Sequence, residues 1–281
     1  MRRNDRRGVA LIFVLGLLVF LGVIATEVGG TARLETNMVA SLRARTVARY
    51  VAESGTVVAK RRIEALLDSA DSPAERSEIM RDLRHRLGDL SEVRLGRARF
   101  GIAVVDLNAR IDLNRAEAPT LIGLFRQFTG ETRAELIVAA LKANPVVRVS
   151  DLPLVPGVGD AVAVDVAPYV TVWSDGIVNI NSAPEAVLAA LPGLGPSEAK
   201  SLIERRDAGE LFSGTSAPED GGTRVTVTSL TPARLVSTVP TRLLVVARGW
   251  DDSSPLTHEL QSVYAVVGTQ LVLQGSQERD L

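Results

Sequence analysis

The stretch that decides the fold is GVALIFVLGLLVFLGVIAT, which occupies residues 8–26. From Val9 to Thr26 there are 18 residues without a charge, and a helix needs roughly 20 apolar residues to cross a bilayer. Four arginines and one acid, Asp5, precede the run in residues 1–7. Because positive charge on a short flank keeps that flank in the cytoplasm, the sequence predicts a single-pass membrane helix with the rest of the chain across the membrane.

Three interpretations of this run compete. A cleaved signal peptide has an apolar region of about 7–15 residues and small residues at the cut, and Ala25-Thr26-Glu27 fits that pattern poorly. A plain signal anchor is the second interpretation. The third is a basic leader that ends at Arg7-Gly8 and is cut before Val9, so that the apolar helix stays on the mature protein. The residues beyond Thr26 decide among them.

Helical periodicity continues well past the apolar run. Apolar residues recur at steps of three and four, and no proline occurs before Pro73. The pattern predicts one helix from about Val9 to Asp68, on the order of 90 Å long. A signal peptide has no reason to be fused in phase to such a helix. We therefore expect a helix that is half in lipid and half packed on a globular domain.

Composition limits the function classes. The 281 residues include no cysteine, which excludes disulfides, and only two histidines, His85 and His258, which disfavours a zinc site. Residues 1–100 have a net charge of +6 and residues 101–281 a net charge of −7. No paired-carboxylate site, Ser-His-Asp order, phosphate loop or metal cluster is visible in the sequence. We expect a protein that is not an enzyme, in which both histidines are surface or packing residues.

The remainder of the chain predicts a mixed α and β organisation. Ser72-Pro73 with Glu75 is typical of a helix start, and predicts a short helix from Pro73 to about Leu87. Further elements are expected as a strand over 97–106, helices over 118–128 and 131–142, and strands over 169–172, 224–228, 242–249, 260–267 and 270–273. The last strands, with a hairpin loop over 251–255, predict an antiparallel sheet packed on the long helix.

A short pattern occurs twice in the middle of the chain. Ile111-Asp112-Leu113-Asn114-Arg115-Ala116 matches Val178-Asn179-Ile180-Asn181-Ser182-Ala183 at an offset of 67 residues. Each copy leads into a segment with helical spacing. We expect Asn114 and Asn181 to end a short extended segment and to bind the backbone before a helix begins, because amides have no useful acid–base chemistry.

Two glycine hairpins accompany the repeated pattern. Pro156-Gly157-Val158-Gly159 and Pro192-Gly193-Leu194-Gly195 each separate two short helical segments, as in helix-hairpin-helix elements. Many such hairpins bind DNA through loop amides and basic side chains. Residues 151–200, however, hold six acids against Lys200 alone, a net charge of −5. Because DNA binding draws on lysine and arginine, we interpret the hairpins as protein scaffold and expect no nucleic-acid partner.

Together these features resemble the K-type minor pseudopilin of the type II secretion system. The resemblance covers essentially the whole length and rests on the order of its motifs. These are Arg7-Gly8 before the apolar helix, Tyr50-Val51-Ala52-Glu53-Ser54-Gly55, which is similar to the Tyr-x-Ala-Glu-x-Gly segment of that family, the two Asn patterns, 156–159, 169–172 and the second hairpin. Most pilins have glutamate at the fifth residue after the cut, where this chain has Phe13. In the family that absence suits a subunit at the tip, and Phe13 also suits a lipid-facing position.

The resemblance implies an α+β fold: a long N-terminal helix packed on an antiparallel, pilin-like sheet, with an inserted helical domain that contains the hairpins. It implies a leader at 1–8, a transmembrane part at 9–28, pilin-like parts at 29–107 and 207–281, and the insertion at 108–206. Prepilin peptidase would cut between Gly8 and Val9. The I- and J-type minor pseudopilins and the inner-membrane secretion assembly would be partners, and the complex would initiate and cap the pseudopilus that exports folded proteins from the periplasm.

Two further possibilities remain at this stage. Members of the family can bind calcium, and the acidic candidates are Glu219 and Asp220, followed by Asp251 and Asp252. Neither loop matches the EF-hand pattern, so solvated loops are the favoured interpretation. The alternative function is a membrane-anchored helix-hairpin-helix protein that binds DNA, which the charge of −5 over residues 151–200 opposes.

Overall fold

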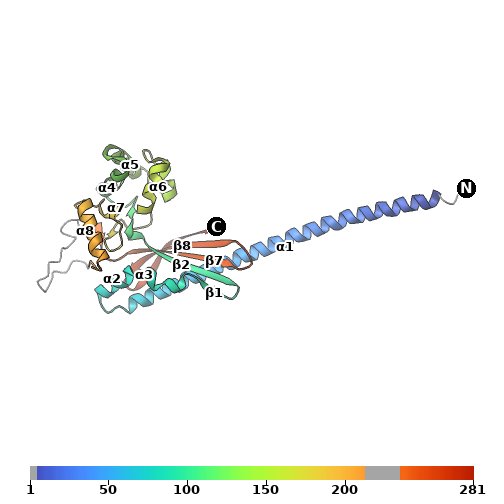
Figure 1. The fold of residues 1–281 in the computed structure, drawn as a ribbon, viewed down its shortest axis with the longest axis horizontal. Helices are drawn as coiled ribbons and strands as arrows, with labels where there is room; N and C mark the ends of the chain where they lie inside the picture. The colour runs from blue at the N-terminus through green and yellow to red at the C-terminus, as the bar shows by residue number, and fades with distance from the viewer. Residues whose placement is uncertain (1–4, 213–234) are drawn as a thin grey trace.

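A computed structural model describes residues 5–212 and 235–281, and gives only the backbone element for residues 5–12, 25–34 and 73. The first element is α1 (Asp5–Asp68), a helix of 64 residues. Its N-terminal half projects away from the rest of the molecule, and its C-terminal half lies against the sheet (Figure 1). The helix predicted to end at Asp68 ends at that residue.

The helix rests on a five-stranded sheet in the order β1-β2-β7-β8-β9, antiparallel throughout. The prediction of an antiparallel sheet packed on the long helix is confirmed. The strands are β1 (Val93–Leu95), β2 (Ala98–Asp106), β7 (Arg242–Asp251), β8 (Thr257–Val267) and β9 (Gln270–Asp280). The chain leaves the sheet after β2 and returns as β7, which pairs with β2. The residues between these two strands are therefore one long insertion in the sheet.

Close backbone approach holds α1 on the sheet. The buried side of the helix is made mostly of small residues, Ala44, Ala48, Ala52, Gly55 and Ala59. A Cβ on Gly249 of β7 would lie 2.1 Å from the Ala48 carbonyl oxygen, and a Cβ on Gly55 would lie 2.8 Å from the Phe100 ring. Since Phe100 and Gly249 are paired across β2 and β7, the ring fills the notch at Gly55 while the helix backbone sits on the gap at Gly249.

Two short helices cover the start of the sheet. The single helix predicted over Pro73 to Leu87 is wrong in its length, because the structure has α2 (Pro73–Arg81) and α3 (Leu83–Arg86) separated at Asp82. The N-cap at Ser72 is confirmed, since its hydroxyl accepts a hydrogen bond from Glu75 N. The carboxylate of Glu75 accepts from Asp71 N instead of Ser72 N, so the capping box is shifted by one residue.

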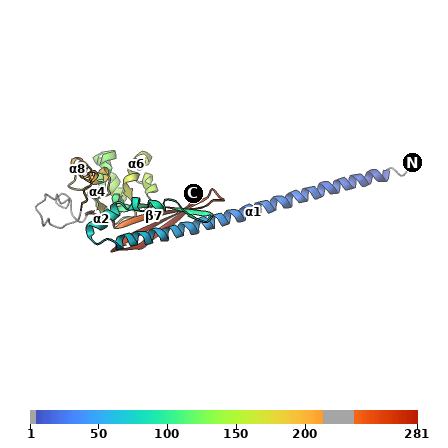
Figure 2. The ribbon, with the colours of Figure 1, turned by 60° about the horizontal axis from the view of Figure 1, so that its bottom comes forward.

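A helical subdomain, residues 107–212, lies on the face of the sheet opposite α1 (Figures 1 and 2). Its elements are α4 (Ala118–Thr129), α5 (Glu131–Ala143), α6 (Gly159–Val166), α7 (Glu185–Leu188) and α8 (Pro196–Asp207), with 3-10 turns η2 (Leu107–Ala109), η3 (Val149–Leu154) and η4 (Ala167–Tyr169). Another 3-10 turn, η1 (Gly88–Leu90), precedes β1. The subdomain has its own core, which includes Ile111, Leu121, Phe125, Ile137 and Leu188.

Two small parallel sheets tie this subdomain together. The strand β3 (Ile111–Asp112) pairs with β4 (Val170–Thr171), and β5 (Val178–Asn179) pairs with β6 (Val236–Ser237). The strand predicted over 169–172 is thus shortened to two residues. The strand predicted over 224–228 lies outside the described residues.

Candidate partner-binding surface on the long helix

Helix α1 has a second face, which is turned away from the sheet. Met38, Leu42, Tyr50 and Val57 lie on it at steps of four, eight and seven residues, and each is exposed. Tyr50 is 63% exposed although it lies where α1 packs on the sheet, and Leu42 is 53% exposed just before the packed part, which begins at Ala44. Exposed apolar patches of this kind mark interaction surfaces, so this face, defined by these four residues, is the helix face available to a partner.

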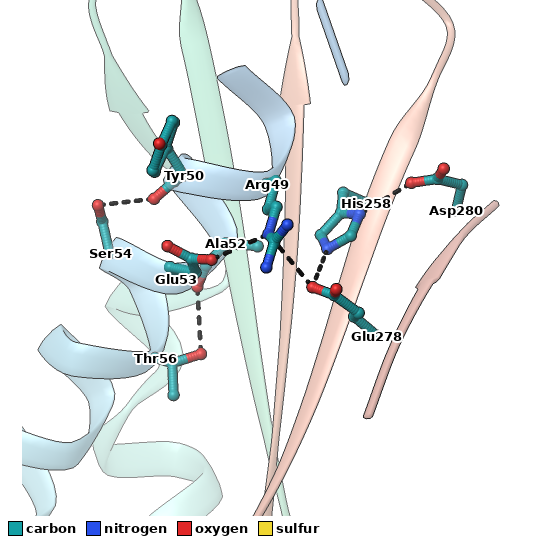
Figure 3. Close-up of polar contacts among 9 residues, drawn as sticks. All are labelled: Arg49, Tyr50, Ala52, Glu53, Ser54, Thr56, His258, Glu278 and Asp280. Carbon is teal, nitrogen blue, oxygen red and sulfur yellow. Dashed lines mark hydrogen bonds and ion pairs between the residues drawn. The ribbon is translucent and has the colours of Figure 1, made fainter. Parts of the chain in front are cut away.

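The Tyr50–Gly55 motif joins this outer face to the sheet. Tyr50 points away from the sheet, whereas Ala52 is fully buried against it (Figure 3). Gly55 receives the Phe100 ring. Ser54 Oγ donates to Tyr50 O at 2.8 Å, which satisfies the hydroxyl within the helix. The motif therefore sets the close seat of the helix and leaves its aromatic residue free for contact.

Beside the motif, charges connect α1 to the last strand. Arg45 pairs with Asp280 at 3.1 Å, and Arg49 pairs with both Glu53 at 3.1 Å and Glu278 at 3.3 Å. Figure 3 shows Arg49 reaching from the helix toward β9. We call these pairs, with the histidine described next, the helix–β9 seam.

His258 lies at the centre of the seam. The residue is 5% exposed, with Nδ1 2.8 Å from Asp280 Oδ1 and Nε2 3.4 Å from Glu278 Oε2 (Figure 3). Nδ1 is hydrogen-bonded to Asp280, whereas Nε2 lies near the Glu278 carboxylate without a hydrogen bond. The expectation that His258 is a surface or packing residue is therefore too simple, since the buried ring makes specific polar contacts. Sequence analysis missed the seam because Arg45 and Arg49 lie more than 200 residues along the chain from their partners on β9.

A buried charged residue, Glu259, lies next to His258 on β8. Glu259 is 1% exposed, and its carboxylate accepts from Arg248 at 2.7 Å, Gln261 at 2.6 Å and Arg279 at 2.7 Å. Burial alone would raise the pKa of Glu259, but these hydrogen bonds and the charge of Arg279 outweigh it and hold the pKa below its usual value. The Glu259 carboxylate on β8 is thus kept ionised by Arg248 of β7 and Arg279 of β9.

In the helical subdomain, the repeated Asn pattern does what the sequence predicted. Asn114 Nδ2 donates to Val146 O at 2.8 Å and its Oδ1 accepts from Val146 N at 2.9 Å. Asn181 makes the same pair of bonds to Phe212, at 2.8 and 3.0 Å, and adds one to Thr238 O at 2.7 Å. Each side chain thereby ties a short strand to the segment that follows its helical pair, and the predicted backbone role is confirmed.

A third copy of the pattern escaped the sequence analysis. Asp106-Leu107-Asn108 places Asn108 N 2.8 Å from Asp106 Oδ1, as Asn114 N lies 2.9 Å from Asp112 Oδ1. Asn108 is fully buried and bonds to Asp175, Ile177, Thr241 and Arg242, so it binds the end of β2 to the start of β7. The signal was present as Val105-Asp106-Leu107-Asn108, but Arg110 stands where the other two copies end in alanine.

Both carboxylates in these turns have pKa values shifted upward. Burial raises the pKa of Asp106 despite hydrogen bonds from Ser182, Asn179 and Asn108, and burial raises the pKa of Asp112 despite three backbone N–H donors and the charge of Arg115. Neither carboxylate has an arginine bound to it as Glu259 has. The pKa of the buried carboxylate is therefore lowered at Glu259 in the sheet and raised at Asp106 and Asp112 in these turns.

The glycine hairpins offer little to a nucleic-acid backbone. Arg133 donates to Gly157 O at 2.6 Å and to Val158 O at 3.1 Å, which uses this cation inside the protein. At the second hairpin, the Glu198 carboxylate accepts from Gly195 N at 3.1 Å, so an acidic side chain already occupies the amide at the start of α8. The DNA-binding alternative is not supported.

The other predicted site residues are placed as follows. Gly8 and Val9 lie within α1, where their side chains are not described, and Phe13 is strongly exposed. Glu219 and Asp220 lie outside the described residues. In the described part of the chain, no helix has the combined length and apolarity needed to span a membrane. Cleavage at Gly8–Val9, the role of Phe13 and calcium at Glu219 and Asp220 stay predictions.

The second calcium candidate does not fit the metal. Asp251 Oδ1 accepts from Ser253 N at 2.8 Å and from the Ser253 hydroxyl at 2.5 Å, and Asp252 pairs with Arg99 at 2.9 Å. Both carboxylates already have partners within the loop or across it. Among the described residues, no group of three or more acidic, histidine or cysteine side chains is arranged to hold a metal ion.

Comparisons with known proteins agree with this architecture. Residues 178–217 match the family described as type II secretion system, protein K. The fold is similar to a chain of the GspK-GspI-GspJ complex from the type 2 secretion system of enterotoxigenic Escherichia coli, with a TM-score of 0.59 and 14% identity over 86% of this chain and 99% of that chain. The resemblance to the K-type minor pseudopilins is confirmed. A search of curated proteins found no match. The mixed α and β fold with an antiparallel sheet is shared with the K-type structure.

Proposed function

We propose that this chain acts as a minor pseudopilin at the tip of the type II secretion pseudopilus, where it initiates and caps assembly for export of folded proteins from the periplasm. The observation that carries the proposal is the exposed helix face at Met38, Leu42, Tyr50 and Val57, on a helix whose other side is seated on the sheet. Subunits that assemble through long helices need one helix face held rigidly and another left free. The role is structural, and we propose no catalytic activity.

The partners we propose are the I- and J-type minor pseudopilins. The similar solved structure is a complex of GspK with GspI and GspJ, and the helix face here is apolar enough to pack against neighbouring helices. We expect Leu42→Glu to abolish copurification with the I- and J-type subunits, because it places a charge in the centre of this face. Arg62→Glu is the matched control, on an exposed position of the same helix. Unchanged copurification of Leu42→Glu would contradict this use of the helix face.

We further propose that the helix is anchored in the inner membrane, with the N-terminus in the cytoplasm and the sheet and helical subdomain in the periplasm. The charge-free run from Val9 to Thr26 and the arginines before it support this. Prepilin peptidase would cut between Gly8 and Val9, and the new N-terminus would be methylated. Phe13 replaces the glutamate that most pilins have, as suits a subunit with nothing above it.

The processing proposal is tested by mass analysis of the mature N-terminus, with and without prepilin peptidase. We expect an N-terminus at Val9 that appears only when the peptidase is present. An N-terminus at Met1 in both samples would make the chain a plain signal anchor. A cut near Gly30 would remove the apolar helix and end the membrane proposal together with the tip role.

The helical subdomain is the proposed cap. Its predicted range, 108–206, would act as an insertion in a pilin-like body formed by 29–107 and 207–281, and its bulk would block further addition above. Asn108 Oδ1 accepts from Thr241 N at 2.9 Å. Residues 108 and 241 are therefore adjacent, and a short glycine linker can replace residues 109–240, which are the insertion together with the segment that leads from it to β7. We expect that variant to enter the membrane but to give pseudopili of uncontrolled length. Unchanged length and secretion would contradict capping.

Calcium binding at Glu219 and Asp220 is a separate proposal, based on the family and on the oxygen-rich side chains. Titration of calcium into the protein should raise its thermal midpoint, and Glu219→Gln with Asp220→Asn should remove the rise. A rise that persists in the double variant would place the calcium elsewhere, and the absence of any rise would end the proposal.

A further inference from the structure

The outer strand of the sheet carries an exposed edge. Strand β9 pairs with β8 along its length, and in the described part of the chain no strand lies on its other side. Leu271 is its one buried residue. The register shifts at Gln274, because Val263 pairs with Gly275 whereas Tyr264 pairs with Leu273. An edge strand presents a row of backbone N–H and C=O groups that are ready to pair with another chain.

The centre of this edge lacks the usual protection. Exposed edge strands are commonly guarded by charged side chains, and the charges of β9 are confined to Glu278, Arg279 and Asp280. Those three are engaged with Arg49, Glu259 and Arg45. From Val272 to Gln277 the strand is uncharged, and Val272 and Leu273 are exposed. This central stretch is therefore a surface that favours a partner.

A groove runs along this part of the strand. Two adjoining hollows of about 330 and 590 Å³ share Val172, Trp173 and Gln277 in their walls. The Gln274–Gln277 stretch of β9 lines one side of the groove, and the Val172–Trp173 loop of the helical subdomain lines the other. Leu244 of β7 and Val263 of β8 also line it, so the groove extends from the β9 edge over the face of the sheet. The sheet and the helical subdomain thus form the two walls, with an aromatic ring between the hollows.

Charge at one end of the groove indicates what an occupant carries. The larger hollow is lined by Arg110 and Arg148, and also by Glu278 and Arg279. Glu278 and Arg279 are paired with Arg49 and Glu259, whereas Arg110 and Arg148 have no ion pair within residues 13–212 or 235–281. Burial lowers the pKa of Arg110, because the half-buried guanidinium has lost part of its water. An acidic side chain entering this end would supply the missing counter-charge.

We propose that an extended segment of a partner pseudopilin adds to β9 as a sixth strand, with an apolar side chain against Trp173 and an acidic side chain toward Arg110 and Arg148. Backbone pairing would give affinity, and the hollows would select side chains, as in other strand additions. The location favours the partner that packs on the helix face, since Asp280 at the end of β9 pairs with Arg45, about one turn beyond Leu42. One subunit that packs on the helix face can therefore reach the strand edge. This inference rests on the proposed function.

Crosslinking separates the two ideas. A photoreactive residue is placed singly at Gln277 in the groove, at Leu42 on the helix face and at Leu136, an exposed residue of α5, as the control. The full chain is expressed with the I- and J-type subunits. Crosslinks to either subunit from both Gln277 and Leu42, with none from Leu136, are the expected result. Crosslinks from Leu42 without Gln277 would overturn the added strand and leave the function standing, and crosslinks from neither would overturn both.

Proline substitution tests the backbone pairing itself. Consecutive residues of a strand direct their N–H groups to opposite sides of the strand. Of the two variants Ser276→Pro and Gln277→Pro, one therefore removes a hydrogen-bond donor to β8, and the other removes a donor on the open edge. We expect the variant that loses the donor to β8 to have a lower thermal midpoint. We expect the variant that loses the open-edge donor to fold normally and to bind the partner at least tenfold more weakly. Ser276→Ala and Gln277→Ala are the controls. If the variant that loses the open-edge donor folds normally and binds the partner as tightly as the wild type does, the proposal is overturned.

Discussion

The helix–sheet unit and the helical subdomain are held together by different means. In the helix–sheet unit, α1 touches the backbone of β7 at Gly249, and charged pairs join α1 to the outer strand β9. In the helical subdomain, buried amides and carboxylates fasten short strands to the loops beside them, around a separate apolar core. The difference suits the proposed roles: the first unit must keep a helix aligned over a long distance, while the second must keep its own shape.

The two units also differ in how much of them could be predicted. The period of α1 is repeated over many residues, so its existence and its end at Asp68 followed from the sequence, as did the existence of β7 and β8. The last strand was predicted only over 270–273, whereas β9 extends from Gln270 to Asp280. The short strands of the helical subdomain are two residues long, too short for any period. The doubled Asn pattern revealed β3 and β5, and the strand predicted over 169–172 was twice the length of β4.

The largest expected effect breaks the helix–sheet contact. Gly249→Ala places a Cβ 2.1 Å from the Ala48 carbonyl oxygen, and neither backbone can move without separating α1 from the sheet. We expect the free energy of unfolding to fall by about 3 kcal/mol, measured by urea titration of the detergent-solubilised protein. Gly275→Ala is the control, because a Cβ there meets no atom within 4 Å. Equal stability of the two variants would contradict the close seat of the helix.

A slightly smaller effect is expected from the amide locks of the helical subdomain. Asn181→Ala leaves the buried N–H and C=O of Phe212 and the carbonyl of Thr238 without their partner. Each unsatisfied group costs about 1 kcal/mol or more, so we expect a loss of roughly 2–3 kcal/mol in the free energy of unfolding. Asn144→Ala, at an exposed helix end, should change it by less than about 0.5 kcal/mol. If Asn181→Ala behaves like Asn144→Ala, the repeated pattern is not structural.

The side-chain contacts themselves lie beyond what the sequence could predict. The helix–β9 seam joins Arg45 and Arg49 to Glu278 and Asp280, and no local spacing connects residues so far apart. Gly249 looks like an ordinary strand residue until the helix is placed on it. The candidate surface was therefore predictable as an amphipathic helix, whereas the contacts that orient it depend on the tertiary arrangement.

Acid should distinguish the two kinds of buried carboxylate. The pKa of Glu259 is lowered in the folded state, so its contribution is present above the unfolded value of about 4.3 and is lost as pH falls through the folded pKa. Raised pKa values at Asp106 and Asp112 have the opposite sign: their ionisation disfavours the fold as pH rises through the folded pKa. Glu259→Gln should therefore lose about 1–2 kcal/mol at pH 7, with less difference from wild type at pH 3.

That pH series is measured by urea titration of Glu259→Gln and the wild type at each pH. Glu131→Gln, an exposed carboxylate of α5, is the control and should follow the wild type closely. A stability difference between Glu259→Gln and the wild type that grows toward pH 3 would reverse the sign argued from Arg248 and Arg279. It would mean that the arginines do not hold Glu259 ionised in the folded protein.

The smallest effect is expected at the helix–β9 seam. Arg45 and Arg49 are each more than half exposed, and exposed ion pairs contribute about 0–1 kcal/mol and weaken in salt. The double variant Arg45→Ala/Arg49→Ala should therefore lower the free energy of unfolding by less than about 1 kcal/mol, and 1 M salt should remove most of the difference from wild type. A loss as large as that of Gly249→Ala would mean that charge, not backbone contact, holds α1 on the sheet. Because β9 is also the proposed edge for a sixth strand, a variant that keeps its stability but loses the Gln277 crosslink would show that the seam positions the strand edge for its partner.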